Sequence, residues 1–165
     1  TQHLLKLGSK NIALVSTIDN LSVGKLRVGG FKKAMEASNL SLNNQLIVIE
    51  NDIELFDNKL IELFNTKKVD AVFALDEHAS TMAMKFALKK GIKIPEELNI
   101  IGFADGVWSR RLTPSLSTVS QHGPEIGEAA TRLLIERLES KEEEYKYKTV
   151  VVKTELRQRD STRKM

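Results

Sequence analysis

The sequence has 165 residues and contains no cysteine, so disulfide bonds and thiol chemistry are excluded. This absence fits a reducing cytosol, and we expect a cytoplasmic protein. No apolar run reaches the length of about 18 residues that a membrane-spanning helix needs. The first residues also lack the basic, apolar and small-residue pattern of a secretion signal. We therefore expect no membrane partner.

Side chains that could build a catalytic or metal centre are scarce. His78 and His122 are far apart in the sequence, and no histidine or acidic cluster has metal-ligand spacing. Ser80 and Ser120 lack the context of a nucleophile elbow. Gly29-Gly30 lies inside a helical pattern rather than in a phosphate-binding loop. An enzyme is therefore the weakest hypothesis, and neither a metal nor a cofactor is expected.

The formal net charge of +3 could indicate a nucleic-acid partner. However, the basic residues lie in pairs near the ends of predicted helices, where they complement the helix dipole. There is neither a basic stripe nor a recognition-helix pattern. We therefore expect that this chain does not itself bind DNA.

Short apolar runs alternate with helical patterns over the first hundred residues. This βαβ rhythm predicts a three-layer α/β fold, in which helices cover both faces of a parallel sheet. The expected strands are residues 12–16, 46–50, 69–75 and 98–103, and the expected helices are residues 23–38, 56–66 and 77–90.

The rhythm then changes. A polar loop follows residue 103, at the carboxyl end of a strand, where ligands bind in open α/β sheets. Its residues Ala104, Asp105, Gly106 and Trp108 are candidates for a pocket rim. Beyond it we expect a strand at 116–119, a helix at 124–139, an acidic solvated turn at 142–144 and a last strand at 149–152. The helix carries one apolar stripe, formed by Ile126, Ala130, Leu133, Leu134 and Leu138.

An ordered set of motifs runs nearly from end to end: KNIALVS at 10–16, RVGGF at 27–31, VDAVFALDEHA at 69–79, GIKIPEELNIIGF at 91–103, TPSLSTV at 113–119 and LRQRDS at 156–161. Together they resemble the effector-binding domain of the lactose-repressor (LacI/GalR) family of transcription regulators. The resemblance implies a periplasmic-binding-protein-like fold of type I.

The resemblance also implies a domain organisation. Residues 1–120 would form one nearly complete, C-terminal lobe, 121–152 a remnant of the N-terminal lobe, and 153–165 the return segment and tail. The first eight residues read as a helix already in progress, which suggests a fragment. An amino-terminal helix-turn-helix module that contacts DNA would then lie outside this chain.

Four polar residues are candidate ligand contacts. Arg27 follows a polar loop at a helix start, where its planar fork could hold hydroxyls or a carboxylate, and it matches the family's effector-binding arginine; the alternative is an ordinary surface arginine. Asp76 is more simply a helix N-cap than a pocket acid. Asp105 could accept hydrogen bonds from sugar hydroxyls, or serve a turn with Gly106. Gln121 matches a family ligand position, or is an exposed hinge amide.

Trp108 could stack on a sugar ring. The resemblance slightly favours a dimer contact instead, because the loop after residue 103 and the helix at 77–90 lie at the subunit interface in this family. The expected interface residues are His78, Met82, Trp108, Arg111 and Leu112.

Two positions depart from the family pattern. Leu75 replaces a common asparagine, and Ala104 replaces a common aspartate. Either the effector is less hydroxyl-rich than a simple sugar, or other residues compensate. The favoured function is the ligand-sensing and dimerisation part of a LacI-type regulator that responds to a small molecule, such as a sugar or sugar derivative. The alternative is a periplasmic sugar-binding transport receptor.

Overall fold

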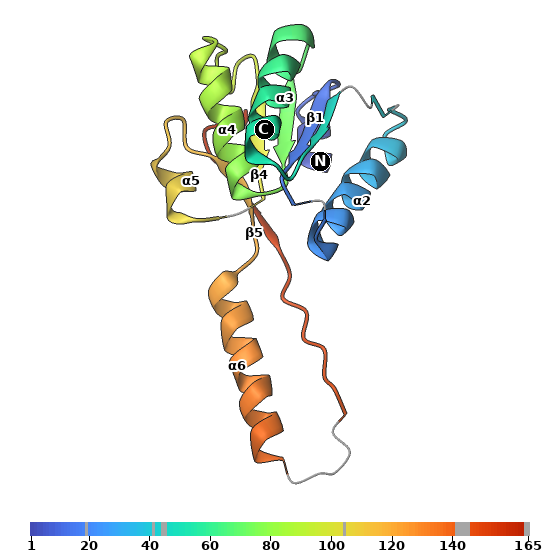
Figure 1. Cartoon of the computed structure of the whole chain (residues 1–165), viewed down its shortest axis with the longest axis vertical. Helices are drawn as coiled ribbons and strands as arrows, with labels where there is room; N and C mark the ends of the chain where they lie inside the picture. The colour runs from blue at the N-terminus through green and yellow to red at the C-terminus, as the bar shows by residue number, and fades with distance from the viewer. Residues whose placement is uncertain (19, 41, 44–45, 104, 141–145, 164–165) are drawn as a thin grey trace.

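The computed structural model describes residues 1–18, 20–40, 42–43, 46–103, 105–140 and 146–163. Helices and strands alternate through most of this length (Figure 1). Their order is α1 (Gln2–Lys6), β1 (Ile12–Ser16), α2 (Ser22–Ala37), β2 (Ile47–Ile49), α3 (Ile53–Thr66), β3 (Ala71–Ala74), α4 (Glu77–Lys89), β4 (Asn99–Gly102), α5 (Val107–Arg111), β5 (Ser117–Ser120), α6 (Gly123–Glu139) and β6 (Glu155–Arg157).

One six-stranded sheet organises the fold, with the strand order β2-β1-β3-β4-β5-β6. The first five strands in this order pair in parallel, and only β6 runs antiparallel to its neighbour β5. The carboxyl ends of β1, β3, β4 and β5 therefore meet at one edge of the sheet, where a doubly wound fold binds its ligands.

Helices cover both faces of the sheet, as predicted. On one face, α3 and α4 pack on β-strand side chains that include Val15, Val72 and Ile100. On the other face, α1 and α2 contribute Leu4 and Phe31 to a second core. The strands β1, β3 and β4 are buried at every position, which explains why the sequence shows continuous apolar runs there.

The helix α6 and residues 146–154 project away from the sheet (Figure 1). No residue of α6 is buried, and Leu138 in its apolar stripe is 76% exposed. The apolar stripe predicted from the sequence is therefore present and lies open to solvent. None of the helices in the described residues has the length and apolarity needed to cross a membrane.

The predicted elements up to α6 agree with the structure to within a few residues. The strand predicted at 149–152 is wrong. These residues lie outside any helix or strand, and Val151 is 79% exposed. A β-branched run forms a strand only where another strand offers hydrogen-bonding partners, and in the described residues none lies beside this one. The last strand is instead β6, whose partner is β5.

Two sequence predictions fall on residues outside those described. They are the place of Ala104 in the pocket rim and the acidic turn at 142–144.

Candidate functional site

The side chain of Arg27 connects the ends of three neighbouring parallel strands. Its Nη1 donates a hydrogen bond of 2.6 Å to the carbonyl oxygen of Leu75, the first residue after β3. Its guanidinium lies 3.8 Å from the ring centre of Phe103, the first residue after β4. Its Nη2 donates a 2.9 Å hydrogen bond to Oε1 of Gln121, the first residue after β5. These contacts hold the planar donor group in a fixed orientation at the carboxyl edge of the sheet.

The environment of Arg27 is half-buried. Burial lowers its pKa, and the negative charge of Asp76 offsets part of this effect. A guanidinium remains protonated at any physiological pH, so Arg27 is a permanent cation there.

Asp76 is an N-cap, as the sequence favoured. Its Oδ1 accepts a 2.8 Å hydrogen bond from the backbone N–H of Ala79 in the first turn of α4. Its Oδ2 accepts a second one, also of 2.8 Å, from the N–H of Thr17 after β1. Both carboxylate oxygens therefore stabilise local structure, and they hold the β1–α2 loop close to the start of α4. Asp76 as a ligand contact stays a prediction.

The carboxylate of Asp105 is at the centre of a network of donors and is only 5% exposed. It accepts hydrogen bonds from Arg159 Nη2 at 2.6 Å and from Thr118 Oγ1 at 2.9 Å, and it pairs with Nη1 of Arg157. Burial raises the pKa of Asp105, but the hydrogen bonds and positive charges of its partners outweigh it, so the pKa lies below its usual value. A role in ligand binding stays a prediction for Asp105, whose oxygens already have internal donors.

An open groove of about 770 Å³ lies along the sheet face that α1 and α2 cover, and Thr1, Gln2 and His3, the first residues of the given sequence, form part of its wall. Arg27 and Phe103 lie in its wall, together with Val119 and Leu156 from β5 and β6. The groove is lined mainly by apolar side chains. A half-buried arginine in an apolar wall is suited to fix the polar end of a small molecule.

The structure thus brings two of the five predicted ligand residues, Arg27 and Gln121, into direct contact. Asp76 is adjacent, because it follows the Leu75 carbonyl that Arg27 binds. Trp108 lies on α5 and is 65% exposed, and it is not in the lining of the groove. Among the described residues, no group of histidine and acidic side chains could hold a metal ion.

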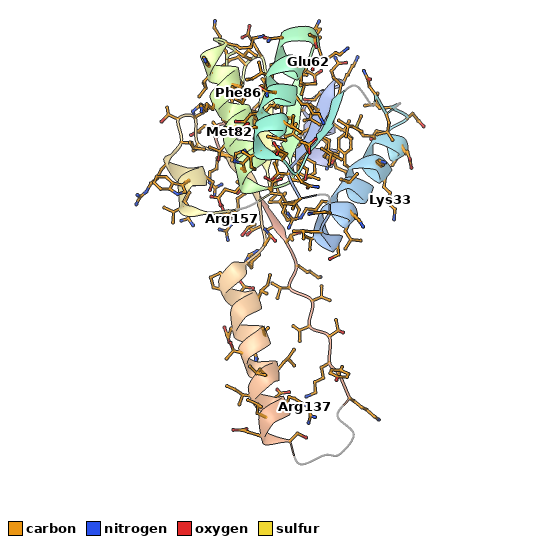
Figure 2. The ribbon with its side chains drawn as sticks, in the orientation of Figure 1. Lys33, Glu62, Met82, Phe86, Arg137 and Arg157 are labelled. Atoms are coloured by element: carbon orange, nitrogen blue, oxygen red, sulfur yellow. The ribbon has the colours of Figure 1, made fainter. Side chains whose placement is uncertain are left out.

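The five predicted interface residues lie on α4, on α5 and just after α5. Trp108 and Arg111 are exposed, whereas Met82 and Leu112 are partly buried against the core beneath α4. Figure 2 shows Met82 and Phe86 on the same helix. The His78 ring is directed toward α3, with Nε2 3.5 Å from Asp57 Oδ1 and the ring edge against Phe56. Their role in a dimer stays a prediction.

Three contributing residues were not identified from the sequence. Phe103 was assigned only to a strand, although its position directly after an apolar run would place it at the ligand edge. Arg157 and Arg159 lie in residues 153–165, for which the sequence predicted only a return segment and tail. Their spacing of two residues, which puts side chains on one side of an extended chain, was the available signal that both could reach one carboxylate.

Comparison with known proteins shows the family of the chain. Residues 1–162 match the family described as periplasmic binding protein-like domain. The HTH-type transcriptional repressor PurR of Haemophilus influenzae is 32% identical over 148 residues, which cover 87% of this chain and 43% of the repressor. The HTH-type transcriptional regulator MalR of Clostridium butyricum is 28% identical over 97% of this chain and 48% of its own length. The chain therefore spans about half the length of these curated relatives.

Solved structures agree as well. A regulatory protein of LacI family from Chloroflexus aggregans is 27% identical, with a TM-score of 0.84 over 98% of this chain and 58% of that one. A LacI family transcriptional regulator from Mycobacterium smegmatis is 25% identical, with a TM-score of 0.83 over 98% of this chain and 60% of that one. These relatives are regulators of transcription rather than enzymes, as the sequence predicted. The chain belongs to the periplasmic binding protein-like domain family and is an effector-binding domain of the LacI/GalR-regulator type.

Proposed function

We propose that this chain is the ligand-sensing part of a cytoplasmic DNA-binding regulator, which works as a homodimer and responds to a small molecule such as a sugar or sugar derivative. DNA contact is assigned to a helix-turn-helix module outside these 165 residues. The relatives named as HTH-type regulators support this assignment over a periplasmic transport receptor.

The observation that carries the proposal is the position of Arg27. Its donor fork is held by Leu75 and Gln121 at the carboxyl edge of the sheet, and Arg27 also lines an apolar groove. Directed donors in an apolar wall select a ligand by the position of its oxygens. Hydrogen-bond donors of this kind hold a ligand without reacting with it, which fits a sensor.

The crossing segment supplies a mechanism for the response. Gln121 lies between β5 in the sheet and α6 outside it, so a ligand that engages Arg27 also contacts the point where the chain leaves the sheet. A ligand that binds one arrangement of this crossing more tightly than another shifts the population toward the tighter-binding arrangement. The ratio of the two affinities sets the size of the shift.

The test is a ligand screen by thermal unfolding of the natural protein that contains this domain. We expect a sugar-like ligand that raises the Tm of the wild type and does not raise that of Arg27→Met, since only binding to the folded state stabilises it. Arg132→Met on the exposed α6 is the matched control and should keep the response. A ligand that stabilises wild type and Arg27→Met equally would show that the effector binds elsewhere.

A further inference from the structure

Arg27 is a half-buried cation with no carboxylate partner within ion-pair distance among the described residues. Both of its hydrogen-bond acceptors are neutral, namely the Leu75 carbonyl and the Gln121 amide oxygen. Its remaining strong contact is the face of the Phe103 ring. A cation removed from water without a counter-ion is costly, so this arrangement is complementary to an anion.

The other arginines near this edge of the sheet are paired differently. Arg157 and Arg159 both bind the carboxylate of Asp105. Among the described residues, Asp76 is the acid whose negative charge acts on the pKa of Arg27. Both of its carboxylate oxygens are already hydrogen-bonded to backbone N–H groups. Asp76 therefore moderates the charge of Arg27 from a distance but does not bind it.

The groove beside Arg27 has the same character. Among the described residues, its ionisable lining side chains are His3, Arg27 and Lys33, and none of them is an aspartate or glutamate. Lys33 lies on α2 with Arg27 (Figure 2). Cationic side chains around a concave apolar surface raise the local concentration of anions there.

The residue that follows β3 adds no polar side chain beside Arg27. Leu75 is fully buried and presents only its carbonyl oxygen, which Arg27 occupies. The wall contributes apolar groups from Phe103, Val119 and Leu156. An uncharged sugar would find few partners for its hydroxyls here, whereas a ligand with an acid group, a sugar derivative included, could bind the guanidinium in the bidentate manner that its planar fork favours.

We infer that the effector of this site carries an anionic oxygen group, a carboxylate or a phosphate, that binds Arg27, on a body with an apolar face. The inference rests on the proposed function, which it deepens by naming the ligand class. These two hydrogen bonds use only part of the donors of the guanidinium. An anionic oxygen takes the place of Gln121 Oε1 at Nη2, and this exchange releases the amide at the β5–α6 crossing.

The test follows the Arg27 Nε–Hε signal and the Gln121 side-chain amide signals by NMR in the ¹⁵N-labelled natural protein that contains this domain. Four probes are titrated: benzoate, phenyl phosphate, the uncharged benzyl alcohol and glucose. We expect at least one of the two anions to saturate both signals at a concentration at least about tenfold below that of benzyl alcohol or glucose, as expected for a charge-assisted contact. The comparison of benzoate with phenyl phosphate then distinguishes a carboxylate from a phosphate.

Two variants test whether the anion binds Arg27 itself or responds to the general charge of the groove. Gln121→Glu supplies Arg27 with an internal carboxylate and should raise the anion concentration needed for half-saturation about tenfold. Lys33→Met removes a cation from the same groove and should change this concentration by less than about threefold, because the lysine is exposed. Equal losses in both variants would assign the effect to the general charge of the groove and overturn the role of Arg27.

The two proposals fail in different ways. Saturation by glucose or benzyl alcohol at the same concentration as by the anions would overturn the ligand class and leave a small-molecule sensor in place. If neither anion saturates the Arg27 signal, the anionic ligand class is overturned, whereas the proposed function is decided separately by the thermal-unfolding screen with Arg27→Met.

Discussion

Arg27 Nη2 and Gln121 Oε1 are joined by a hydrogen bond of 2.9 Å, although the residues are 94 positions apart in the sequence. The bond connects α2 with the segment where the chain leaves β5 for α6. The proposed ligand residue and the crossing between the sheet and the projecting helix are therefore one structural unit. A change at either residue is expected to affect the other.

The first prediction concerns the strength of this contact. Gln121→Leu removes the acceptor from a half-buried donor and should lower the free energy of unfolding by about 1 to 2 kcal/mol. Gln121→Glu makes the bond charge-assisted and should raise it by about 0.5 to 1 kcal/mol at pH 7. Urea denaturation of the three proteins measures both changes. Identical unfolding curves would mean that the contact adds nothing to stability.

The second prediction concerns Asp105, where β6 and the tail attach to the loop after β4. Asp105→Asn keeps the shape of the side chain but leaves Arg157 and Arg159 without their counter-ion. We expect a loss of about 2 to 3 kcal/mol at pH 7, less than for a fully buried pair because Arg157 is partly exposed. Asp160→Asn, an exposed acid in the same tail, is the control and should change stability by less than about 0.5 kcal/mol.

The pH dependence of this effect has a defined sign. The pKa of Asp105 is lowered in the folded state, so the folded protein holds fewer protons here than the unfolded chain. The stabilisation is complete above the unfolded value of about 3.9 and is lost as the pH falls through the folded pKa. The difference between wild type and Asp105→Asn should therefore shrink below about pH 4. A difference that stays constant from pH 7 to pH 3 would argue against the ionised pair.

Much of the fold was predictable, because its central strands are buried on both faces. A strand such as β3 must be apolar at each position, and this pattern is visible without knowledge of its neighbours. By contrast, β6 has the pattern of an exposed segment, since Glu155 and Leu156 are both exposed. It is a strand because β5 lies beside it, and a long-range pairing of this kind leaves no local signal.

The site was predictable only in part, for a related reason. Arg27 and Gln121 were identified by resemblance to a family, and nothing local to either residue indicates their hydrogen bond. Asp76 and Asp105 differ in how much of their role could be predicted. Asp76 precedes a helix, so its capping role could be inferred from position alone. The arginine partners of Asp105 lie in the tail, more than 50 residues away, and only the folded chain brings them together.

The third prediction concerns the close approach of α4 to β4. A Cβ atom at Gly102 would lie 2.8 Å from Ser80 Oγ and 3.1 Å from Leu116 Cδ2, both closer than ordinary van der Waals contact. Gly102→Ala should lower the free energy of unfolding by about 1 to 3 kcal/mol through overpacking.

Gly106→Ala is the matched control for this change. The added methyl group would meet only the carboxylate end of Glu77, which is exposed and can move aside. Its effect should stay within about 0.5 kcal/mol. Equal effects of the two substitutions in urea denaturation would show that the added side chain alone, and not the contact with Ser80, sets the change at Gly102.

The last prediction concerns the proposed dimer face. Trp108 is 65% exposed on α5, beside the exposed Val107, and large exposed aromatic groups are the usual anchors of protein interfaces. Trp108→Asp should raise the dimer dissociation constant by at least about tenfold, because it places a charge in the contact. Leu26→Asp, at a position 76% exposed on α2 over the other face of the sheet, should leave association unchanged. Sedimentation velocity over a range of concentrations measures both, with Tm as a check on folding, and a wild type that stays monomeric throughout would refute this interface.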